Sequence, residues 1–313
     1  MGKINIALLA GGWSGEREIS LRSGDNVFKT LNKKKYFVTM YDPRNDLEKL
    51  IKEREKIDLV FILLHGKFGE DGCIQGFLNL LGLPFIGSDV LSSAMAMNKN
   101  VAKEMYKKTG LNVIKDIVIN RHQDFSAEQI MMKIKPPMLV KPVTEGSSLG
   151  ISVCHSEKEL LKGINLAFQY DQEVMVEQYI KGREITCCVI GNRPVQTLPL
   201  IEIMPGQGHI FFDYKAKYTP GAVKEICPAK VSASIAEEAK YCAIKAHKAL
   251  NCRIWSRSDM ILLDEKIYIL ETNTIPGMTE TSLVPLAAKA AGISLPQILD
   301  RLISLSLESA DSR

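Results

Sequence analysis

The sequence lacks any apolar run that approaches the roughly 20 residues needed for a membrane-spanning helix. It also lacks a basic arm, because its 40 Lys and Arg and its 36 Asp and Glu are spread along the chain and leave a net charge of +4. We therefore expect no membrane insertion and no nucleic-acid partner. With 313 residues, 46% of them hydrophobic, the chain has material for two or three globular domains.

Cysteine is present but forms no recognisable framework. The seven Cys are an odd number, two are adjacent, and none belongs to a CxxC motif. This spacing argues against a disulfide scaffold and against a structural zinc site. The short apolar run near the N-terminus is not followed by the small-residue cleavage pattern of a signal peptide. We therefore expect a cytoplasmic protein with reduced thiols.

Two common nucleotide-binding motifs are also missing. The sequence has no GxxxxGK[ST], and its first glycine turn, AGGWSGE, does not match GxGxxG, so a nicotinamide cofactor gains no support. In their place stands LVKPVTEGSSLGI, a strand-like run followed by Lys141 and a glycine-serine loop. The backbone N–H groups and hydroxyls of such a loop can bind phosphate oxygens. An ordinary hairpin loop is the alternative interpretation.

Strand-like and helix-like segments alternate over residues 1–87. The nearly continuous apolar run IDLVFILLHG is typical of a parallel strand that is buried on both faces. This alternation predicts a small doubly wound α/β domain. Its functional loops should follow the carboxyl ends of the strands, at residues 11–16 and 65–72.

The remainder predicts two α+β units, a central one over residues 88–178 and a C-terminal one over residues 179–313. The central unit should begin with a single helix over residues 92–110, which ends at Gly110. Within the C-terminal unit, about 205–227 form a long, aromatic-rich segment without a regular pattern. A loop of this length usually serves as a lid over a functional site, because unstructured loops beyond roughly 15 residues are uncommon in compact domains.

The stretch SRSDMILLDEKIYILETN predicts a hairpin whose turn is 264–266. That turn places Asp259 opposite Glu271, and the alternation of side chains along a strand places Asn273 on the same face. Two neighbouring carboxylates repel each other, whereas a divalent cation with oxygen ligands stabilises both. The hairpin therefore indicates a Mg²⁺ site. Polar side chains exposed at a strand end are the alternative.

Other polar residues stand at element ends but have ordinary explanations when taken singly. Glu16 follows a glycine turn and suits the start of a helix. His65 ends a buried strand in the glycine-rich stretch HGKFGEDG. Glu177 and Glu184 bracket the turn QYIKGR, which suits either nucleotide binding or a domain junction. Each lysine, considered alone, is compatible with a solvated surface charge.

Seven separate stretches together resemble D-alanine–D-alanine ligases, which are ATP-grasp enzymes. In the family's order they are GGWSGEREIS, HGKFGEDGCIQG, VKPVTEGSSLGI, VEQYIKGREIT, FFDYKAKY, SRSDMIL and LETNTIPGMTETSLVP. The resemblance implies an ATP-grasp fold that combines α/β and α+β units. It also implies that ATP phosphorylates the carboxylate of one D-alanine, that the amine of a second D-alanine attacks the acyl phosphate, and that ADP and phosphate are released. D-alanyl-D-alanine is a precursor for peptidoglycan, and a homodimer is expected from the family.

The resemblance also implies roles around ATP. By position, two Mg²⁺ or Mn²⁺ ions would be held by Asp259, Glu271 and Asn273. The phosphates would be contacted by Lys99, Lys141 and, from the lid, Lys217. Adenine and ribose would be bound by Glu177, Tyr179 and Glu184.

Further roles concern the two substrates. Glu16 would meet the ammonium group of the first D-alanine, with His65 nearby. A hydrogen-bonded triad that closes the lid would consist of Glu16, Ser147 and Tyr218. The developing oxyanion would be held by Arg257 and by the N–H of Gly277, and the second D-alanine would be positioned by Ser282 and Leu283.

Several residues depart from what the family usually shows. Trp13 stands in the first glycine turn, Cys187 and Cys188 replace residues that are commonly Thr and Val, and Ser258 replaces an aliphatic residue. None of these changes removes a reactive group. Relatives that use D-lactate typically carry Phe in place of Tyr218, so this Tyr favours an amine nucleophile. A ligase that takes D-lactate or D-serine second, and a nucleotide-binding regulator without catalysis, are the alternative functions.

Overall fold

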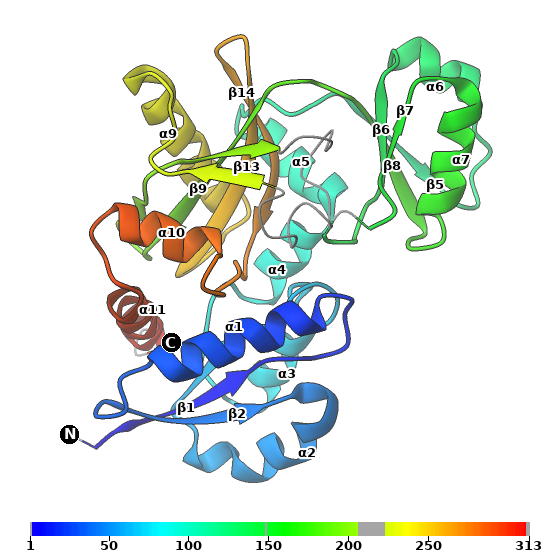
Figure 1. The fold of residues 1–313 in the computed structure, drawn as a ribbon. Coiled ribbons are helices and arrows are strands. Elements are labelled where there is room, and N and C mark those ends of the chain that lie inside the picture. The colour runs from blue at the N-terminus through cyan, green and yellow to red at the C-terminus, as the bar shows by residue number, and fades with distance from the viewer. Residues whose placement is uncertain (1, 148, 206–222, 311–313) are drawn as a thin grey trace.

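Three β-sheets organise the chain in the computed structural model, which describes residues 2–147, 149–205 and 223–310. In Figure 1 the N-terminal sheet lies at the bottom, the largest sheet above it, and the central sheet to one side. Two of the site residues expected from the sequence, Lys217 and Tyr218, lie outside the described residues. Among the helices of the described part, none is long and apolar enough to cross a membrane.

The N-terminal sheet is parallel, with strand order β2-β1-β3-β4. Its central strands are buried on both faces, as the apolar run in the sequence predicts. The elements of this unit are β1 (Ile4–Leu9), α1 (Arg17–Thr30), β2 (Tyr36–Tyr41), α2 (Pro43–Glu53), a short 3₁₀ helix (Arg54–Lys56), β3 (Leu59–Ile62), α3 (Cys73–Leu80) and β4 (Phe85–Ile86). Because β2 and β3 flank β1, the strand order reverses there, and the loops after β1 and β3 come together.

The central sheet is antiparallel, with order β5-β8-β6-β7, and two helices cover one side of it. Its elements are β5 (Asp116–Asn120), α6 (Ala127–Lys133), β6 (Met138–Pro142), β7 (Ser152–Cys154), α7 (Glu157–Ala167) and β8 (Glu173–Gln178). The glycine-serine loop connects β6 to β7. Lys141 therefore lies near the end of a buried strand, immediately before that loop.

The largest sheet has the order β12-β11-β9-β13-β14, and the short β10 also pairs with β9. Its elements and helices are β9 (Arg183–Ile190), β10 (Gln196–Thr197), β11 (Ile201–Pro205), β12 (Val223–Ile226), α9 (Ala233–Ala249), β13 (Trp255–Leu263), β14 (Lys266–Asn273), α10 (Leu283–Ala290) and α11 (Leu295–Ala310). Residues 223–226 form a strand antiparallel to β11, so the end of the segment expected to be irregular is regular structure. Residues 206–222 of that segment lie outside the described residues.

The single helix expected over residues 92–110 is in fact two, α4 (Val90–Met97) and α5 (Lys99–Lys108). Asn98 adopts an extended backbone between them, and its side chain caps α5 by accepting from the N–H of Val101 at 3.0 Å. The break makes Lys99 the first residue of α5. The N–H of Lys99 then donates to the carbonyl of Val143 at 3.1 Å, which joins the helix to the central sheet.

The two helices also pack against the largest sheet. Ala96, Ala102 and Tyr106 belong to the same buried cluster as residues of β9, β13, β14 and α9. Helix α5 therefore bridges the central sheet and the largest sheet, and it lies between them in Figure 1. The boundaries expected at 87/88 and 178/179 remain predictions.

Candidate active site

Two loops of the N-terminal sheet meet at the carboxyl ends of β1 and β3. The hydroxyl of Ser14, in the loop after β1, donates to the carbonyl of His65, in the loop after β3, at 2.6 Å. Ser14 also accepts from the N–H of Glu16 at 3.1 Å. These contacts bring Glu16 and His65 into one region, at the position where open α/β sheets commonly bind ligands.

A loop of the central sheet closes onto this region. The hydroxyl of Ser147 donates to a carboxylate oxygen of Glu16, although 131 residues separate the two in the sequence. Ser147 has a positive φ of 49°, and a Cβ added to Gly146 would lie 3.1 Å from the other Glu16 oxygen. A small residue at 146 therefore allows the close approach. Two members of the expected triad are in contact, and the third, Tyr218, lies outside the described residues.

His65 and Glu70 place ionisable groups beside Glu16. His65 is buried, and this burial lowers its pKa and favours the neutral imidazole. Burial, together with the negative charge of Glu16, raises the pKa of Glu70 to about 8. The N–H of Gly66 donates to the Glu70 carboxyl at 2.6 Å. At neutral pH, Glu70 is therefore mostly protonated, and the ionised carboxylates in this region are fewer than the sequence suggests.

Strands β13 and β14 bring Asp259 opposite Glu271 and Arg257 opposite Asn273. The turn between the strands differs from the expected one, because Leu263 pairs with Lys266 and the loop consists of two residues rather than three. Both of these, Asp264 and Glu265, have positive φ, as a tight hairpin of this twist requires. The expected pairing at the site nevertheless holds, since one extra residue in β14 shifts the register next to Asp259.

Asp259 accepts hydrogen bonds from Arg257 and Thr186. The guanidinium of Arg257 donates to both of its oxygens, at 2.8 and 2.7 Å, and the hydroxyl of Thr186 donates at 2.6 Å. Burial opposes the charge on Arg257, but the Asp259 carboxylate outweighs burial and raises the pKa of Arg257. The cation expected to stabilise an oxyanion is therefore oriented by a residue expected to bind metal.

The opposite face of this hairpin explains one departure from the family pattern. Ser258 is buried and lies 3.0 Å, oxygen to oxygen, from Thr272, which accepts from the hydroxyl of Tyr106 at 2.8 Å. The polar Ser258 thus has a hydrogen-bonding partner in the core. Cys187 and Cys188 project to opposite faces of β9, and both are buried. Cys188 pairs directly with Arg257 across β9 and β13, so it lies on the site face, and it contributes to the raised pKa of Arg257.

The loop after β14 carries Gly277 and is fixed at both ends. Asn273 accepts from the N–H of Ile275 at 3.0 Å through its side chain. Ser282 accepts from the N–H of Thr279 at 2.9 Å, and its hydroxyl lies 2.7 Å from that of Thr279. A Cβ on Gly277 would lie 2.9 Å from the Ser282 hydroxyl, so glycine is the residue that fits this approach. Leu283 follows as the first residue of α10.

Helix α1 also holds this loop. Asn26 donates to the carbonyl of Met278 at 2.7 Å, and the N–H of Met278 donates to the hydroxyl of Ser23 at 3.3 Å. Ser23 in turn lies 3.5 Å from the imidazole of His65. The loop that carries Gly277 is therefore tied to the same N-terminal unit that carries Glu16 and His65.

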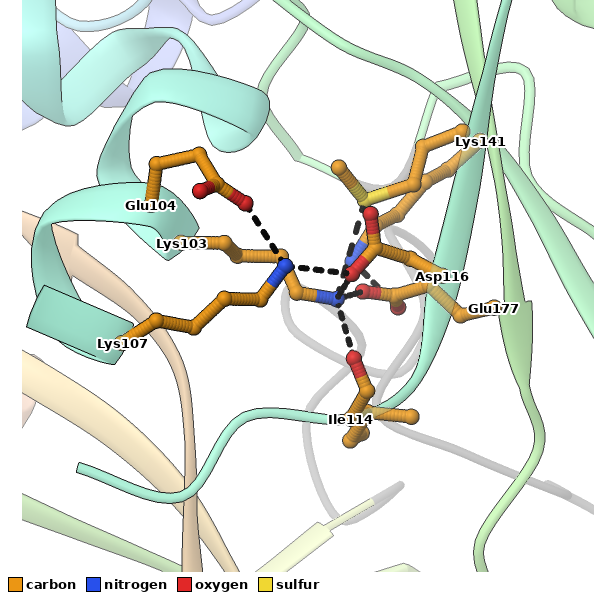
Figure 2. Close-up of polar contacts among 8 residues, drawn as sticks. Lys103, Glu104, Lys107, Ile114, Asp116, Lys141 and Glu177 are labelled. Carbon is orange, nitrogen blue, oxygen red and sulfur yellow. Dashed lines mark hydrogen bonds and ion pairs between the residues drawn. The ribbon is translucent and has the colours of Figure 1, made fainter. Parts of the chain in front are cut away.

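Lysines from α5 and the central sheet meet between the sheets, as Figure 2 shows. Lys141 pairs with one oxygen of Glu177 at 2.6 Å, and Lys103 pairs with the other at 2.6 Å. Burial acts to raise the pKa of Glu177, but the charges of Lys141 and Lys103 outweigh it and lower that pKa. Lys99 donates to the carbonyl of Glu145 in the glycine-serine loop.

Glu184 and Tyr179 lie at the other end of this region. Glu184 is on β9, opposite Ile261 of β13, on the same face as Asp259. The N–H of Tyr179 donates to the carbonyl of Pro137 at 3.0 Å, which anchors it beside the central sheet. Burial, with a contribution from the charge of Glu184, raises the pKa of Tyr179. The pKa of Tyr179 therefore depends in part on the charge of Glu184.

Three residues of this region were not assigned a role from the sequence. Glu70 lies in the stretch HGKFGEDG, whose density of glycine and charge is the only local signal for it. Thr186 faces Asp259 because β9 and β13 pair in that register, which no local pattern reveals. Lys103 is four residues after Lys99 on one helix, a spacing that places both on one face. Their partners come from distant segments.

An aromatic pair joins the two N-terminal loops. Trp13 and Phe68 contact each other edge to face, with ring centroids 5.7 Å apart. Trp13 remains 42% exposed. The unusual Trp13 therefore packs against Phe68 of the neighbouring loop.

The expected metal ligands fit a hard divalent cation in their donor chemistry. Asp259, Glu271 and Asn273 offer carboxylate and amide oxygens on one face of two paired strands. Within the described ranges, no group of three or more His, Cys, Asp and Glu lies close enough to hold a metal. In this structure the guanidinium of Arg257 supplies the positive charge beside Asp259.

Comparison with known proteins gives one consistent result. Residues 42–88 match the family model described as D-ala D-ala ligase N-terminus, and residues 105–304 match D-ala D-ala ligase C-terminus. A D-alanine–D-alanine ligase of Syntrophobacter fumaroxidans is 51% identical over 306 residues, which are 98% of each chain. A crystal structure of the Bacillus anthracis ligase complexed with ATP is 33% identical, with a TM-score of 0.87 over 99% of both chains. The VanG D-Ala:D-Ser ligase of Enterococcus faecalis is 33% identical, with a TM-score of 0.84 over 97% of this chain and all of that one.

Proposed function

Because the chain belongs to the D-alanine–D-alanine ligase family and has its ATP-grasp fold, we propose that it joins two D-alanine molecules at the expense of ATP. The observation that carries this proposal is the 51% identity over nearly the full length of a D-alanine–D-alanine ligase. The site geometry supports it, since Glu16, Arg257 and the oxygen donors of β13 and β14 lie in elements that contact one another. D-lactate or D-serine as the second substrate is not favoured, although the fold also occurs in a D-Ala:D-Ser ligase.

The reaction joins two substrates through an activated carboxylate. The carboxylate of the first D-alanine attacks the γ-phosphorus of ATP, and ADP leaves. The amine of the second D-alanine attacks the acyl carbon, and phosphate leaves as the peptide bond forms. Such a sequence depends on alignment and on charge neutralisation, and alignment of two reactants can lower a barrier by roughly 7–11 kcal/mol.

The residues around the first substrate would have separate roles in binding it. Glu16, oriented by Ser147, would bind the ammonium group of the first D-alanine. His65, neutral because it is buried, would lie beside that substrate as a hydrogen-bonding group without adding a second positive charge. The protonated carboxyl of Glu70 adds no second negative charge beside Glu16.

The tetrahedral intermediate needs donors for its oxyanion. Arg257 and the N–H of Gly277 would supply them, and a single such donor contributes about 3–4 kcal/mol in other enzymes. Ser282 and Leu283, at the start of α10, would position the second D-alanine. The fixed Gly277 loop would keep these donors in place relative to Glu16.

ATP would lie between the central and largest sheets. Its phosphates would be bound by Lys99, Lys141 and Lys217, and its adenine and ribose by Glu177, Tyr179 and Glu184. Lys99 starts a helix, where the N–H groups and the dipole also favour anions.

Asp259, Glu271 and Asn273 would hold two Mg²⁺, or Mn²⁺, ions. Bound there, the ions would neutralise charge on the nucleotide phosphates. Arg257 would then share Asp259 with a cation, and the Thr186 hydroxyl would keep that carboxylate oriented. We further propose that the protein is a cytoplasmic homodimer that supplies D-alanyl-D-alanine for peptidoglycan.

A phosphate-release assay across D-amino acids and D-hydroxy acids tests the proposed function. We expect release that depends on ATP, Mg²⁺ and D-alanine, with none from L-alanine. D-alanyl-D-alanine should form in equal amount, as measured by mass spectrometry. If D-alanine elicits no phosphate while another acid does, the substrate assignment is wrong.

A further inference from the structure

Lys103 is a buried lysine that the reaction described above does not use. It lies on α5, and its side chain is 2% exposed. A buried ammonium group is costly unless it is paired and hydrogen-bonded. Lys103 meets this need with hydrogen bonds to the carbonyl of Ile114 at 2.7 Å and to Glu177 at 2.6 Å, and with an ion pair to Asp116 at 2.9 Å (Figure 2).

Glu177 forms ion pairs with two lysines, and these lysines differ in how many other groups hold them. Lys103 binds one of its oxygens and is held in place by two further groups, the Ile114 carbonyl and Asp116. Lys141 binds the other oxygen at 2.6 Å and stands next to the glycine-serine loop. Asp116 and Glu177 face each other across β5 and β8, so one ammonium group reaches both carboxylates.

The buried charges of this cluster are equal in number and opposite in sign. Two buried carboxylates, Asp116 and Glu177, meet two buried ammonium groups, Lys103 and Lys141. Lys107 adds a partly exposed charge 3.6 Å from Asp116, but it pairs with Glu104 at 2.7 Å. If Lys141 turns toward a phosphate, Lys103 is the buried cation that stays on Glu177.

We propose that Lys103 is a positioning residue that keeps Glu177 neutralised and thereby frees Lys141 to bind the phosphates of a nucleotide. The proposal rests on the proposed function, because it assumes that Lys141 contacts phosphate. Without Lys103, Glu177 would retain Lys141 as its sole buried cation among the described residues. Nucleotide phosphates would then compete with a buried carboxylate for the same ammonium group.

The charge relationships agree with this role. Lys141 and Lys103 together lower the pKa of Glu177, so the carboxylate stays ionised and continues to attract cations. Lys99 and Lys103 lie one helical turn apart on α5, so the helix that fixes the neutralising lysine also presents Lys99 at its N-terminus. Binding of phosphate by Lys99 and release of Lys141 therefore depend on the same helix.

Calorimetric titration with ATP, ADP and adenosine tests the proposal without requiring turnover. We expect Lys103→Met to weaken ATP and ADP binding by roughly tenfold or more, the scale seen when one partner of a buried charge pair is removed. Adenosine, which lacks phosphates, should bind as it does to the unaltered protein. Lys107→Met, one turn later on the same helix, is the matched control and should change none of the three affinities.

A second substitution separates positioning from simple support of the fold. Adding Glu177→Gln to Lys103→Met removes the carboxylate that retains Lys141, so the ratio of ATP affinity to adenosine affinity should return to within about threefold of the original. Gln keeps an acceptor oxygen for an adenine amino group. If Lys103→Met leaves ATP affinity unchanged, weakens adenosine equally, or is not rescued by Glu177→Gln, the proposal is wrong.

If Lys103→Met does not fold, Glu177→Gln alone still tests the proposal. The proposal then expects the ratio of ATP affinity to adenosine affinity to stay within about threefold of the original or to rise, because Lys141 no longer has a carboxylate to leave, whereas loss of an adenine contact would weaken both ligands equally. A tenfold fall in this ratio would overturn it. Failure of the ligase assignment is distinguishable, since it would appear as absent D-alanine-dependent phosphate release by the unaltered protein, whatever the nucleotide affinities.

Discussion

Asp259 lies directly opposite Glu271 across β13 and β14, and a one-residue bulge in β14 makes this pairing possible. Between the turn and the bulge, the strands pair in a register one residue away from that at the site. Leu270 is the extra residue, and it returns Glu271 and Asn273 to the face that carries Asp259 and Arg257. Bulges often redirect side chains near active sites, because each one reverses the alternation of faces.

We expect Glu271→Gln to lower kcat by roughly 100-fold or more, the scale on which electrostatic catalytic groups act. The amide removes one of the two carboxylates proposed to hold the divalent cation. Phosphate release at saturating D-alanine and ATP measures the effect, and a thermal melt checks the fold. Glu265→Gln, in the exposed turn of the same hairpin, is the control and should retain full activity. Retained activity of Glu271→Gln at ordinary Mg²⁺ would remove Glu271 from the metal site.

Glu70 should make stability depend on pH. Its pKa rises from an ordinary 4.5 to about 8 in the folded protein, so folding favours the protonated form. This contribution to the free energy of unfolding is complete below about pH 4.5 and is lost as pH rises through 8. Glu70→Gln imitates the protonated form. Its free energy of unfolding relative to the original protein should therefore increase from pH 5.5 to pH 8.5.

Urea unfolding at several pH values measures this difference. Glu55→Gln, on the exposed surface, is the control and should follow the original protein throughout. Parallel pH profiles for Glu70→Gln and the original protein would show that Glu70 is not protonated in the folded state.

Asn26→Ala should slow the reaction although Asn26 is assigned no substrate contact. The substitution removes the 2.7 Å hydrogen bond to the carbonyl of Met278, next to the Gly277 N–H proposed to bind the oxyanion. A lost hydrogen bond of about 1–1.5 kcal/mol corresponds to roughly a tenfold lower kcat if it acts through the transition state. Asp25→Ala, exposed on the same helix, should leave kcat unchanged. Equal kcat for both variants would mean that the loop keeps its position without Asn26.

Tyr218→Phe should raise the use of D-lactate relative to D-alanine as second substrate. The expectation comes from the sequence, because Tyr218 lies outside the described residues and Phe is typical of relatives that use D-lactate. Competition between the two acids, with depsipeptide and dipeptide separated by mass spectrometry, measures the ratio. Tyr179→Phe controls for loss of a hydroxyl elsewhere in the chain. An unchanged product ratio would refute this account of specificity.

Much of the fold follows from local pattern. The continuous apolar run before His65 predicts a doubly buried parallel strand, and β3 is buried on every residue. The expected single helix over residues 92–110 is wrong because Asn98 satisfies the N–H of Val101, so ending one helix and starting another costs little. A periodic apolar pattern continues across such a break, and sequence periodicity therefore does not detect it.

The hairpin that carries Asp259 and Glu271 is a second feature that the sequence pattern does not fully predict. A three-residue turn without a bulge and a two-residue turn with a bulge give the same pairing of Asp259 with Glu271. The sequence pattern does not distinguish them, because what differs is the backbone of Asp264, Glu265 and Leu270. The predicted pairing is confirmed, while the predicted turn is wrong.

By itself, the sequence determined the chemical groups of this protein and their family: the acidic hairpin, the glycine-serine loop, Glu16, Arg257 and the order of seven motifs. Such features are local, since they depend on residue type, alternation and turn chemistry. The tertiary structure alone decided the charge partners. Lys103 with Glu177, Asn26 with Met278 and Ser147 with Glu16 are 74, 252 and 131 residues apart. Their contacts arise because sheets and helices from separate segments bury their apolar faces together, and no local pattern encodes that packing.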